Sequence, residues 1–167
     1  MKTLWSYINE RGSRSRSSLS IGQNSTVEDI GGGKVKKTYN LDHIKYCDLP
    51  FVEYCFKHKS KVFPIVYEYG DNWIVLEKLK LNTPEIKKWF KYLDDVEYEG
   101  KSIYEWSKEE NVNEQIFDEY GLKVYHWCKQ CQKEMKEMNS PYINWPGDLV
   151  INNVGQRKNG DIVFFDI

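Results

Sequence analysis

The sequence predicts an α+β fold, with an antiparallel, β-rich front half followed by a mostly helical half. Short apolar runs separated by Gly-containing segments fill residues 19–39, and two aromatic and β-branched runs flank Gly70 and Asp71. Residues 113–138 instead repeat apolar side chains at helical spacing. Strands followed by helices are typical of the α+β class. A chain of 167 residues is enough for one domain with a small lobe attached.

Two hairpins are predicted in the front half. The three glycines at residues 31–33 mark the turn of the first hairpin, because glycine adopts positive φ without steric cost. Gly22 marks an earlier turn, so residues 19–39 are expected to form three short strands. The runs at residues 62–70 and 72–81 are expected to form the second hairpin.

Two helices are predicted from their starts and their apolar faces. The first covers residues 49–58, where Asp48 can cap the helix and Pro50 suits its first turn. The second covers residues 83–93, where Thr83 can cap and a proline follows directly. The faces expected to be buried carry Phe51, Tyr54, Cys55 and His58 in the first helix and Ile86, Trp89, Phe90 and Leu93 in the second.

The longest predicted helix covers residues 113–138, with a further short helix before it. Two strands follow, at residues 149–154 and 162–165, joined by a turn at residues 158–161. The apolar positions of the long helix recur in steps of three and four. They are Ile116, Phe117, Tyr120, Val124, Trp127, Cys128, Cys131, Met135 and Met138.

The cysteine pattern allows a metal interpretation and a core interpretation. Cys128 and Cys131 form a C-x-x-C motif with His126 just before it, which is one half of a typical zinc site. Cys47 and Cys55, eight residues apart, do not supply the second half. Because Cys128 and Cys131 fall on the predicted apolar stripe, we expect two reduced thiols in the core.

Composition restricts the class of protein. The 24 basic and 25 acidic side chains give a net charge of −1, which argues against a whole-chain nucleic-acid binder. The basic segment RGSRSRSS lies in residues 1–18, which are expected to form a flexible arm; the alternative is a phosphate-contacting tail. No apolar run reaches the length of a membrane span, and no apolar leader follows the first methionine. A cytoplasmic protein without membrane contacts is therefore expected.

Two acidic residues and an amide lie close together in the tail. Asp148 precedes Asn153 by five residues, and Asp166 ends the following apolar strand. A hairpin between them can bring these side chains to one place. Hard oxygen ligands of this kind suit Mg²⁺ with phosphates in its remaining positions. The alternative is that they are a turn residue, a bulge and a surface charge.

The order of segments resembles the protein-kinase-like superfamily, including small-molecule kinases of the aminoglycoside phosphotransferase type. The first three strands of that fold resemble IGQNSTVEDIGGGKVKKTY, and its helix C resembles LPFVEYCFKH. The next two strands and the hinge resemble FPIVYEYGDNWIVLEKL. The catalytic loop and the metal-binding strand resemble PGDLVINNV and IVFFDI. The compact chain, rich in Lys and Tyr, also resembles small phage-encoded kinase-like proteins.

The resemblance implies an ATP- and Mg²⁺-dependent phosphotransferase with a hydroxyl acceptor on a protein or a small molecule. Asp148 would accept the proton of that hydroxyl or orient it. Asn153 and Asp166 would be ligands of the metal. Such enzymes depend on positioning and on neutralisation of phosphate charge.

The resemblance also implies a nucleotide site in the front half. Lys37 would contact the α- and β-phosphates, whereas strand alternation points Lys36 the other way. Glu53 would form an ion pair with Lys37. The remaining nucleotide-binding positions are Gly22, Ser25 and Thr26 over the phosphates, and Glu77 to Leu79 as the hinge that meets the adenine.

On this resemblance, residues 19–80 form the kinase-like N-lobe and residues 81–167 a shortened C-lobe. Only Gly22 remains of the three glycines usual in the phosphate loop, and Pro146 stands where the family has His. The activation segment and acceptor-binding helices of the family have no counterpart after Asp166. A protein partner or a second copy is therefore expected to complete the acceptor side. The alternative is a pseudokinase module that binds and regulates a partner protein.

Overall fold

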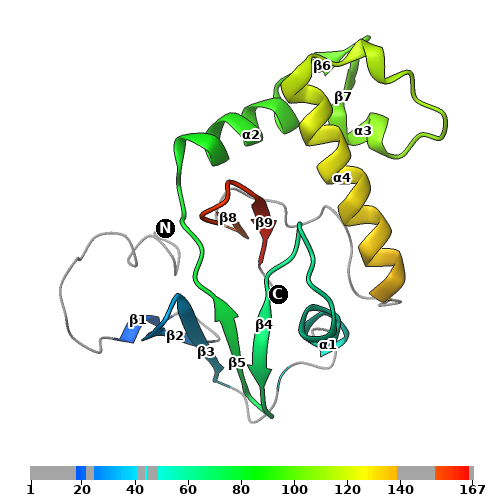
Figure 1. The fold of residues 1–167 in the computed structure, drawn as a ribbon. Coiled ribbons are helices and arrows are strands. Elements are labelled where there is room, and N and C mark those ends of the chain that lie inside the picture. The colour runs from blue at the N-terminus through cyan, green and yellow to red at the C-terminus, as the bar shows by residue number, and fades with distance from the viewer. Residues whose placement is uncertain (1–17, 22–24, 41–43, 45–48, 139–152, 166–167) are drawn as a thin grey trace.

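The computed structural model describes residues 18–21, 25–40, 44, 49–138 and 153–165. It is an α+β structure, as the sequence predicts. A β-sheet with one helix lies at one end of the molecule and three further helices lie at the other (Figure 1). A small hairpin sits between these two parts (Figure 1).

The sheet confirms both hairpins predicted in the front half. Its five strands are antiparallel and run in the order β1-β2-β3-β5-β4. The turn between β2 and β3 contains three glycines with φ of 80°, 61° and 75°, values that favour glycine. The strands are β1 (Ser18–Ile21), β2 (Ser25–Gly31), β3 (Lys34–Tyr39), β4 (Val66–Tyr69) and β5 (Trp73–Glu77).

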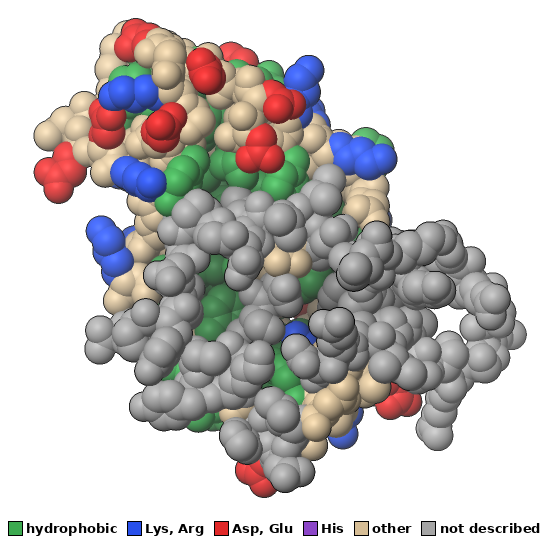
Figure 2. Space-filling model, turned by 180° about the vertical axis from the view of Figure 1, so that it is seen from behind, with side chains coloured by type: hydrophobic (Ala, Val, Ile, Leu, Met, Phe, Trp, Pro, Cys, Tyr) green, Lys and Arg blue, Asp and Glu red, His purple; other side chains and the backbone are tan. Residues whose placement is uncertain are grey.

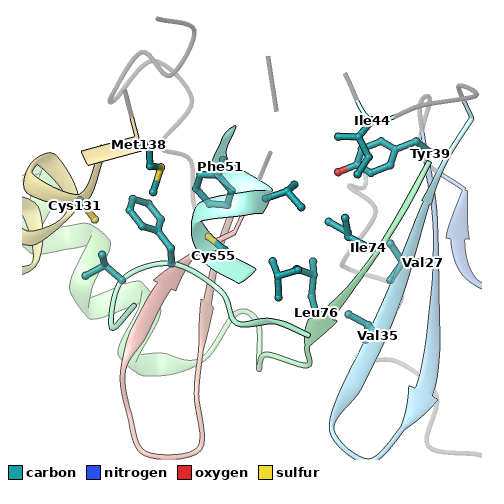
Figure 3. Close-up of a cluster of buried hydrophobic side chains, with 14 residues drawn as sticks. Val27, Val35, Tyr39, Ile44, Phe51, Cys55, Ile74, Leu76, Cys131 and Met138 are labelled. Carbon is teal, nitrogen blue, oxygen red and sulfur yellow. The ribbon is translucent and has the colours of Figure 1, made fainter. Parts of the chain in front are cut away.

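Helix α1 (Leu49–Lys57) packs against one face of this sheet. Its buried residues are Phe51, Val52 and Cys55, so the buried face is rotated slightly from the predicted one. Tyr54 is only partly buried and stacks on His58, with ring centroids 4.4 Å apart. Figure 3 shows the resulting core, which contains side chains of the sheet, of α1 and of the last helix. The sheet contributes Val27, Val35, Ile74 and Leu76, α1 contributes Phe51 and Cys55, and the last helix contributes Cys131 and Met138.

Helix α2 (Pro84–Asp94) forms as the sequence predicts. The Thr83 hydroxyl accepts a hydrogen bond of 3.1 Å from the Ile86 N–H, and Pro84 occupies the first turn. All four apolar residues of the predicted stripe are buried: Ile86, Trp89, Phe90 and Leu93.

The long helix begins later than predicted. A short 3-10 turn, η1 (Glu114–Ile116), precedes α4 (Glu119–Met138), and Phe117 between them is extended. The Asp118 carboxylate accepts a hydrogen bond of 2.7 Å from the Gly121 N–H, which caps the first turn of α4. This hydrogen bond from Gly121 is the main cause that lowers the pKa of Asp118. The apolar spacing of residues 116 and 117 matches a helix, but the cap decides where the helix starts.

The connection between α2 and α4 contains a hairpin that the sequence analysis did not predict. Strands β6 (Glu97–Tyr98) and β7 (Lys101–Ser102) pair, and α3 (Ile103–Ser107) follows with a capping box at Ser102. Glu99 and Gly100 form the turn with φ of 51° and 77°. Two successive positive φ values are typical of a type I′ turn.

The predicted thiol core is confirmed for the C-x-x-C motif. Cys128 and Cys131 are completely buried, and burial raises the pKa of both thiols. Among the described residues, no group of three His, Cys, Asp or Glu side chains could hold a metal ion. None of the described helices combines the length and apolar composition that crossing a membrane requires.

The tail hairpin consists of β8 (Val154–Gln156) and β9 (Ile162–Phe164), with the predicted turn between them. The predicted strand residues before 153 lie outside the described residues. The hairpin also bonds to the rest of the chain. Gln156 exchanges two backbone hydrogen bonds with Lys80, and the Phe164 N–H donates to the Val62 carbonyl at 2.9 Å. The hairpin is thereby attached to segments before β4 and after β5.

Arg157 makes the strongest polar attachment of this hairpin. Its guanidinium donates to the Glu77 carboxylate at 2.6 and 2.9 Å, and both side chains are only 11% exposed. The same guanidinium donates to the carbonyls of Ser60 at 2.9 Å and Phe63 at 2.8 Å. Glu77 also accepts a 2.9 Å hydrogen bond from the Ile65 N–H. One arginine therefore joins the hairpin, β5 and the segment before β4.

Replacing Arg157 by Met should destabilise the protein by about 3–5 kcal/mol, because Glu77 is left as a buried charge without its partner. Urea unfolding measures this change. Lys57→Met, which removes the exposed partner of Glu53, is the control and should change stability by less than about 1 kcal/mol. Equal effects of the two substitutions would contradict the anchoring role of Arg157.

Candidate functional site

Seven of the predicted site residues lie in the described part of the chain. Three others, Gly22, Asp148 and Asp166, lie outside it. The seven are Ser25, Thr26, Lys37, Glu53, Glu77, Leu79 and Asn153.

The register of the sheet places Lys37 on the face that α1 covers. Lys37 lies two residues from both Val35 and Tyr39 along β3, so it shares their face of the sheet, and both of these residues are buried in the core. Its Nζ lies 5.1 Å from the centroid of the Tyr39 ring. Lys36 points to the opposite face, where its Nζ lies 4.6 Å from the Trp73 ring centroid. The two lysines therefore differ in environment as strand alternation predicts.

The same register separates the two predicted hydroxyl residues. Ser25 pairs with Tyr39 and is buried, so it shares the face of Lys37. Thr26 pairs with Thr38 and points to the opposite face. Of these two hydroxyls, only that of Ser25 is on the side of the sheet that carries Lys37.

Glu53 does not pair with Lys37 in this structure. Its Oε2 lies 3.5 Å from Lys57 Nζ, one helical turn away, and no ion pair between described residues joins it to Lys37. Because α1 buries Phe51 and Cys55, Glu53 stays at the edge of its buried face, 42% exposed.

The segment after β5 offers a peptide group for hydrogen bonding. Leu79 is 6% exposed and packs with Leu81, Val163 and Phe165. Lys78 and Lys80 on either side use their N–H groups for backbone hydrogen bonds, whereas the N–H and C=O of Leu79 have none within the described part of the chain. A buried peptide without partners is unfavourable unless a ligand or water satisfies it.

Glu77, the other predicted hinge position, has a structural role. Its N–H donates to the Ile65 carbonyl at 3.0 Å, and its carboxylate holds Arg157. Of these two predicted hinge residues, Leu79 is therefore the candidate for binding a ligand through its backbone groups.

Asn153 lies beside the end of β9. The Phe165 N–H donates to the Asn153 carbonyl at 2.9 Å. Phe165 directly precedes Asp166, so Asn153 lies next to the strand end from which that carboxylate follows. The predicted convergence of Asp148, Asn153 and Asp166 stays a prediction, because Asp148 and Asp166 lie outside the described residues.

Arg157 is the important residue that the sequence analysis missed. It lies in a polar turn, where a solvated role is the usual expectation. A compositional signal was present: the chain has 20 Lys and four Arg, and Arg157 is the only Arg outside the arm. Arginine supplies five donors in a fixed plane, which lysine cannot replace.

Comparison with models of protein families, with curated proteins and with solved structures found no match for this chain. On the face shown in Figure 2, acidic and basic side chains are interspersed over the helical part of the molecule. This mixture of charges gives no support to a nucleic-acid surface there.

Gly155 allows β8 to lie directly against Leu79. A Cβ at this position would lie 2.6 Å from the Leu79 Cβ, far inside van der Waals contact. Gly155→Ala should therefore lower stability by about 1–3 kcal/mol through overpacking. Urea unfolding of Gly155→Ala, Leu79→Ala and the double variant checks this, because the double variant should lose less than the sum. Simple additivity would show that the two residues are not in strained contact.

Proposed function

We propose that the chain is an ATP- and Mg²⁺-dependent phosphotransferase of the protein-kinase-like type, acting on a hydroxyl of a protein or a small molecule. The observation that carries the proposal is the hydrogen bond between the Phe165 N–H and the Asn153 carbonyl. It places the backbone of Asn153 beside the strand end that leads to Asp166. An amide oxygen and a carboxylate are suitable Mg²⁺ ligands.

The nucleotide is assigned to the sheet face of Lys37 and to the segment after β5. The peptide groups of Leu79, which have no hydrogen-bond partner among the described residues, supply a donor and an acceptor for an adenine edge. Leu79, Val163 and Phe165 form the buried apolar cluster beside this peptide. Lys37 is the cation on the same face of the sheet as the core, and it contacts the phosphates.

In the proposed reaction, the acceptor hydroxyl attacks the γ-phosphorus and the bond to the β,γ-bridging oxygen breaks. Asp148 takes the hydroxyl proton, and ADP leaves. Asn153 and Asp166 would hold Mg²⁺, which would supply positive charge against the phosphates when bound. Lys37 contributes a further positive charge, and positioning supplies most of the rate enhancement.

A second candidate is a pseudokinase module that regulates a partner protein. The pairing of Glu53 with Lys57 favours it, since an active protein kinase needs the corresponding Lys–Glu ion pair. This candidate predicts nucleotide binding without phosphate transfer, or no nucleotide binding.

The two neighbouring lysines of β3 provide a matched test of nucleotide binding. Lys37→Ala should weaken Mg²⁺·ATP binding about tenfold or more, because a charge-assisted phosphate contact is lost. Lys36→Ala, on the opposite face, should bind within about twofold of the parent chain. Isothermal titration calorimetry measures both. Equal losses, or no binding by the parent at millimolar ATP, would refute the nucleotide site.

Asp148→Ala tests catalysis separately from binding. Its turnover should fall by about 10²–10⁴ because the proton acceptor is lost, while the dissociation constant of Mg²⁺·ATP stays close to that of the parent. Transfer of radioactive phosphate to water or to a panel of hydroxyl acceptors measures turnover. Transfer by Asp148→Ala at the rate of the parent would remove Asp148 from this role. Binding without transfer by the parent would favour the pseudokinase.

A further inference from the structure

A cavity lies on the other side of the tail hairpin from Leu79. Side chains alternate along β9, so Val163 packs with Leu79, whereas Ile162 faces the helical core. Ile162 lines a cavity of about 310 Å³ together with residues of α2, α4 and the segment before β4. This volume is in the range of small-molecule sites, which are typically a few hundred Å³. The cavity is separate from the proposed nucleotide site.

The walls of this cavity are aromatic and aliphatic. Trp89 and Trp127 meet edge to face, with ring centroids 4.6 Å apart, and Val62 and Ile162 complete the apolar lining. The Trp127 Nε1 donates to the Ile162 carbonyl at 2.7 Å, which fixes the orientation of that ring. Fixed aromatic walls favour a planar aromatic ligand.

Trp89 adds an unsatisfied donor. Its side chain is 1% exposed, and its Nε1 has no hydrogen-bond partner in the described structure. Buried indole N–H groups usually have a partner. A ligand with an acceptor atom near the Trp89 edge of the cavity would satisfy this group.

Two lysines, a histidine and a carboxylate lie at the rim of the cavity. Lys61 is exposed and forms no ion pair with the described residues, whereas Lys123 and His126 pair with Glu85 and Glu114 at 3.1 and 3.4 Å. The rim carboxylate of Asp161 already accepts a hydrogen bond of 2.9 Å from Asn159. Lys61 is therefore the rim charge available to an anion.

We propose that this cavity binds a small aromatic carboxylate. The ring lies against Trp89 and Trp127, and the carboxylate lies at the rim beside Lys61. The apolar walls select for the ring, and the rim charge selects for an acid over a neutral ligand of the same shape. The proposal stands independently of nucleotide binding.

Two naphthalene probes of equal ring size test it on the full chain without nucleotide. 2-Naphthoate should bind and shift the indole N–H signals of Trp89 and Trp127 in ¹H–¹⁵N correlation spectra. 2-Naphthalenemethanol should bind about threefold more weakly, as an exposed charge contact is modest. Lys61→Gln should remove that difference. Lys59→Gln, an exposed lysine that does not line the cavity, should keep it.

His126→Trp tests the location of the probe. This exposed rim position tolerates a larger side chain, which should fill the cavity and weaken naphthoate binding about tenfold or more, while the unfolding midpoint stays near that of the parent. Mg²⁺·ATP should not displace naphthoate. Displacement by ATP, unchanged binding to His126→Trp, or no binding at millimolar naphthoate would each overturn the proposal. Equal affinity for the two probes would overturn its charge component.

Discussion

The arrangement of the molecule depends on the buried ion pair between Arg157 and Glu77. The tail hairpin has two strands of three residues, too short to hold a fixed position by their own pairing. Arg157 fixes it by bonding to a carboxylate on β5 and to the carbonyls of Ser60 and Phe63. A buried pair of this kind adds little net stability over an apolar replacement, because both charges lose water. Its effect here is to specify one position, since a displaced hairpin would leave the buried charges of Arg157 and Glu77 without their partners.

That position has consequences on both faces of β9. Val163 and Phe165 meet Leu79 and Leu81, and this contact forms the apolar cluster beside the proposed adenine-binding peptide of Leu79. Ile162, on the other face, receives the Trp127 hydrogen bond and packs against α4. A shift of the hairpin by one residue would exchange the two faces. The ion pair therefore sets the geometry of the proposed nucleotide site and of the tryptophan-lined cavity together.

The sequence predicted the elements whose signals are local. Thr83 and the following proline determine the start of α2, and three glycines determine the first hairpin, without reference to the rest of the fold. The start of α4 at Asp118 and the β6–β7 turn at Glu99 were missed. Aspartate and glutamate occur in several backbone conformations, and contacts with the rest of the fold select one of them. Arg157 could not be assigned, since its partners are about 80 to 97 positions away in the chain. The faces of Lys36 and Lys37 were predictable because strand alternation is a local property.

The ion pair of Glu53 is weak, and this bears on the two candidate functions. Glu53 and Lys57 are 42% and 61% exposed and 3.5 Å apart, so their pairing contributes at most about 0.5 kcal/mol. The apolar contacts of Phe51, Val52 and Cys55 are worth several times more, at about 1.5–3 kcal/mol for a fully buried large apolar side chain. The orientation of α1 is therefore set by its buried face and not by the Glu53–Lys57 pair. Glu53 can leave Lys57 at little cost, so the absence of a Glu53–Lys37 pair among the described residues is weak evidence against the proposed phosphotransferase.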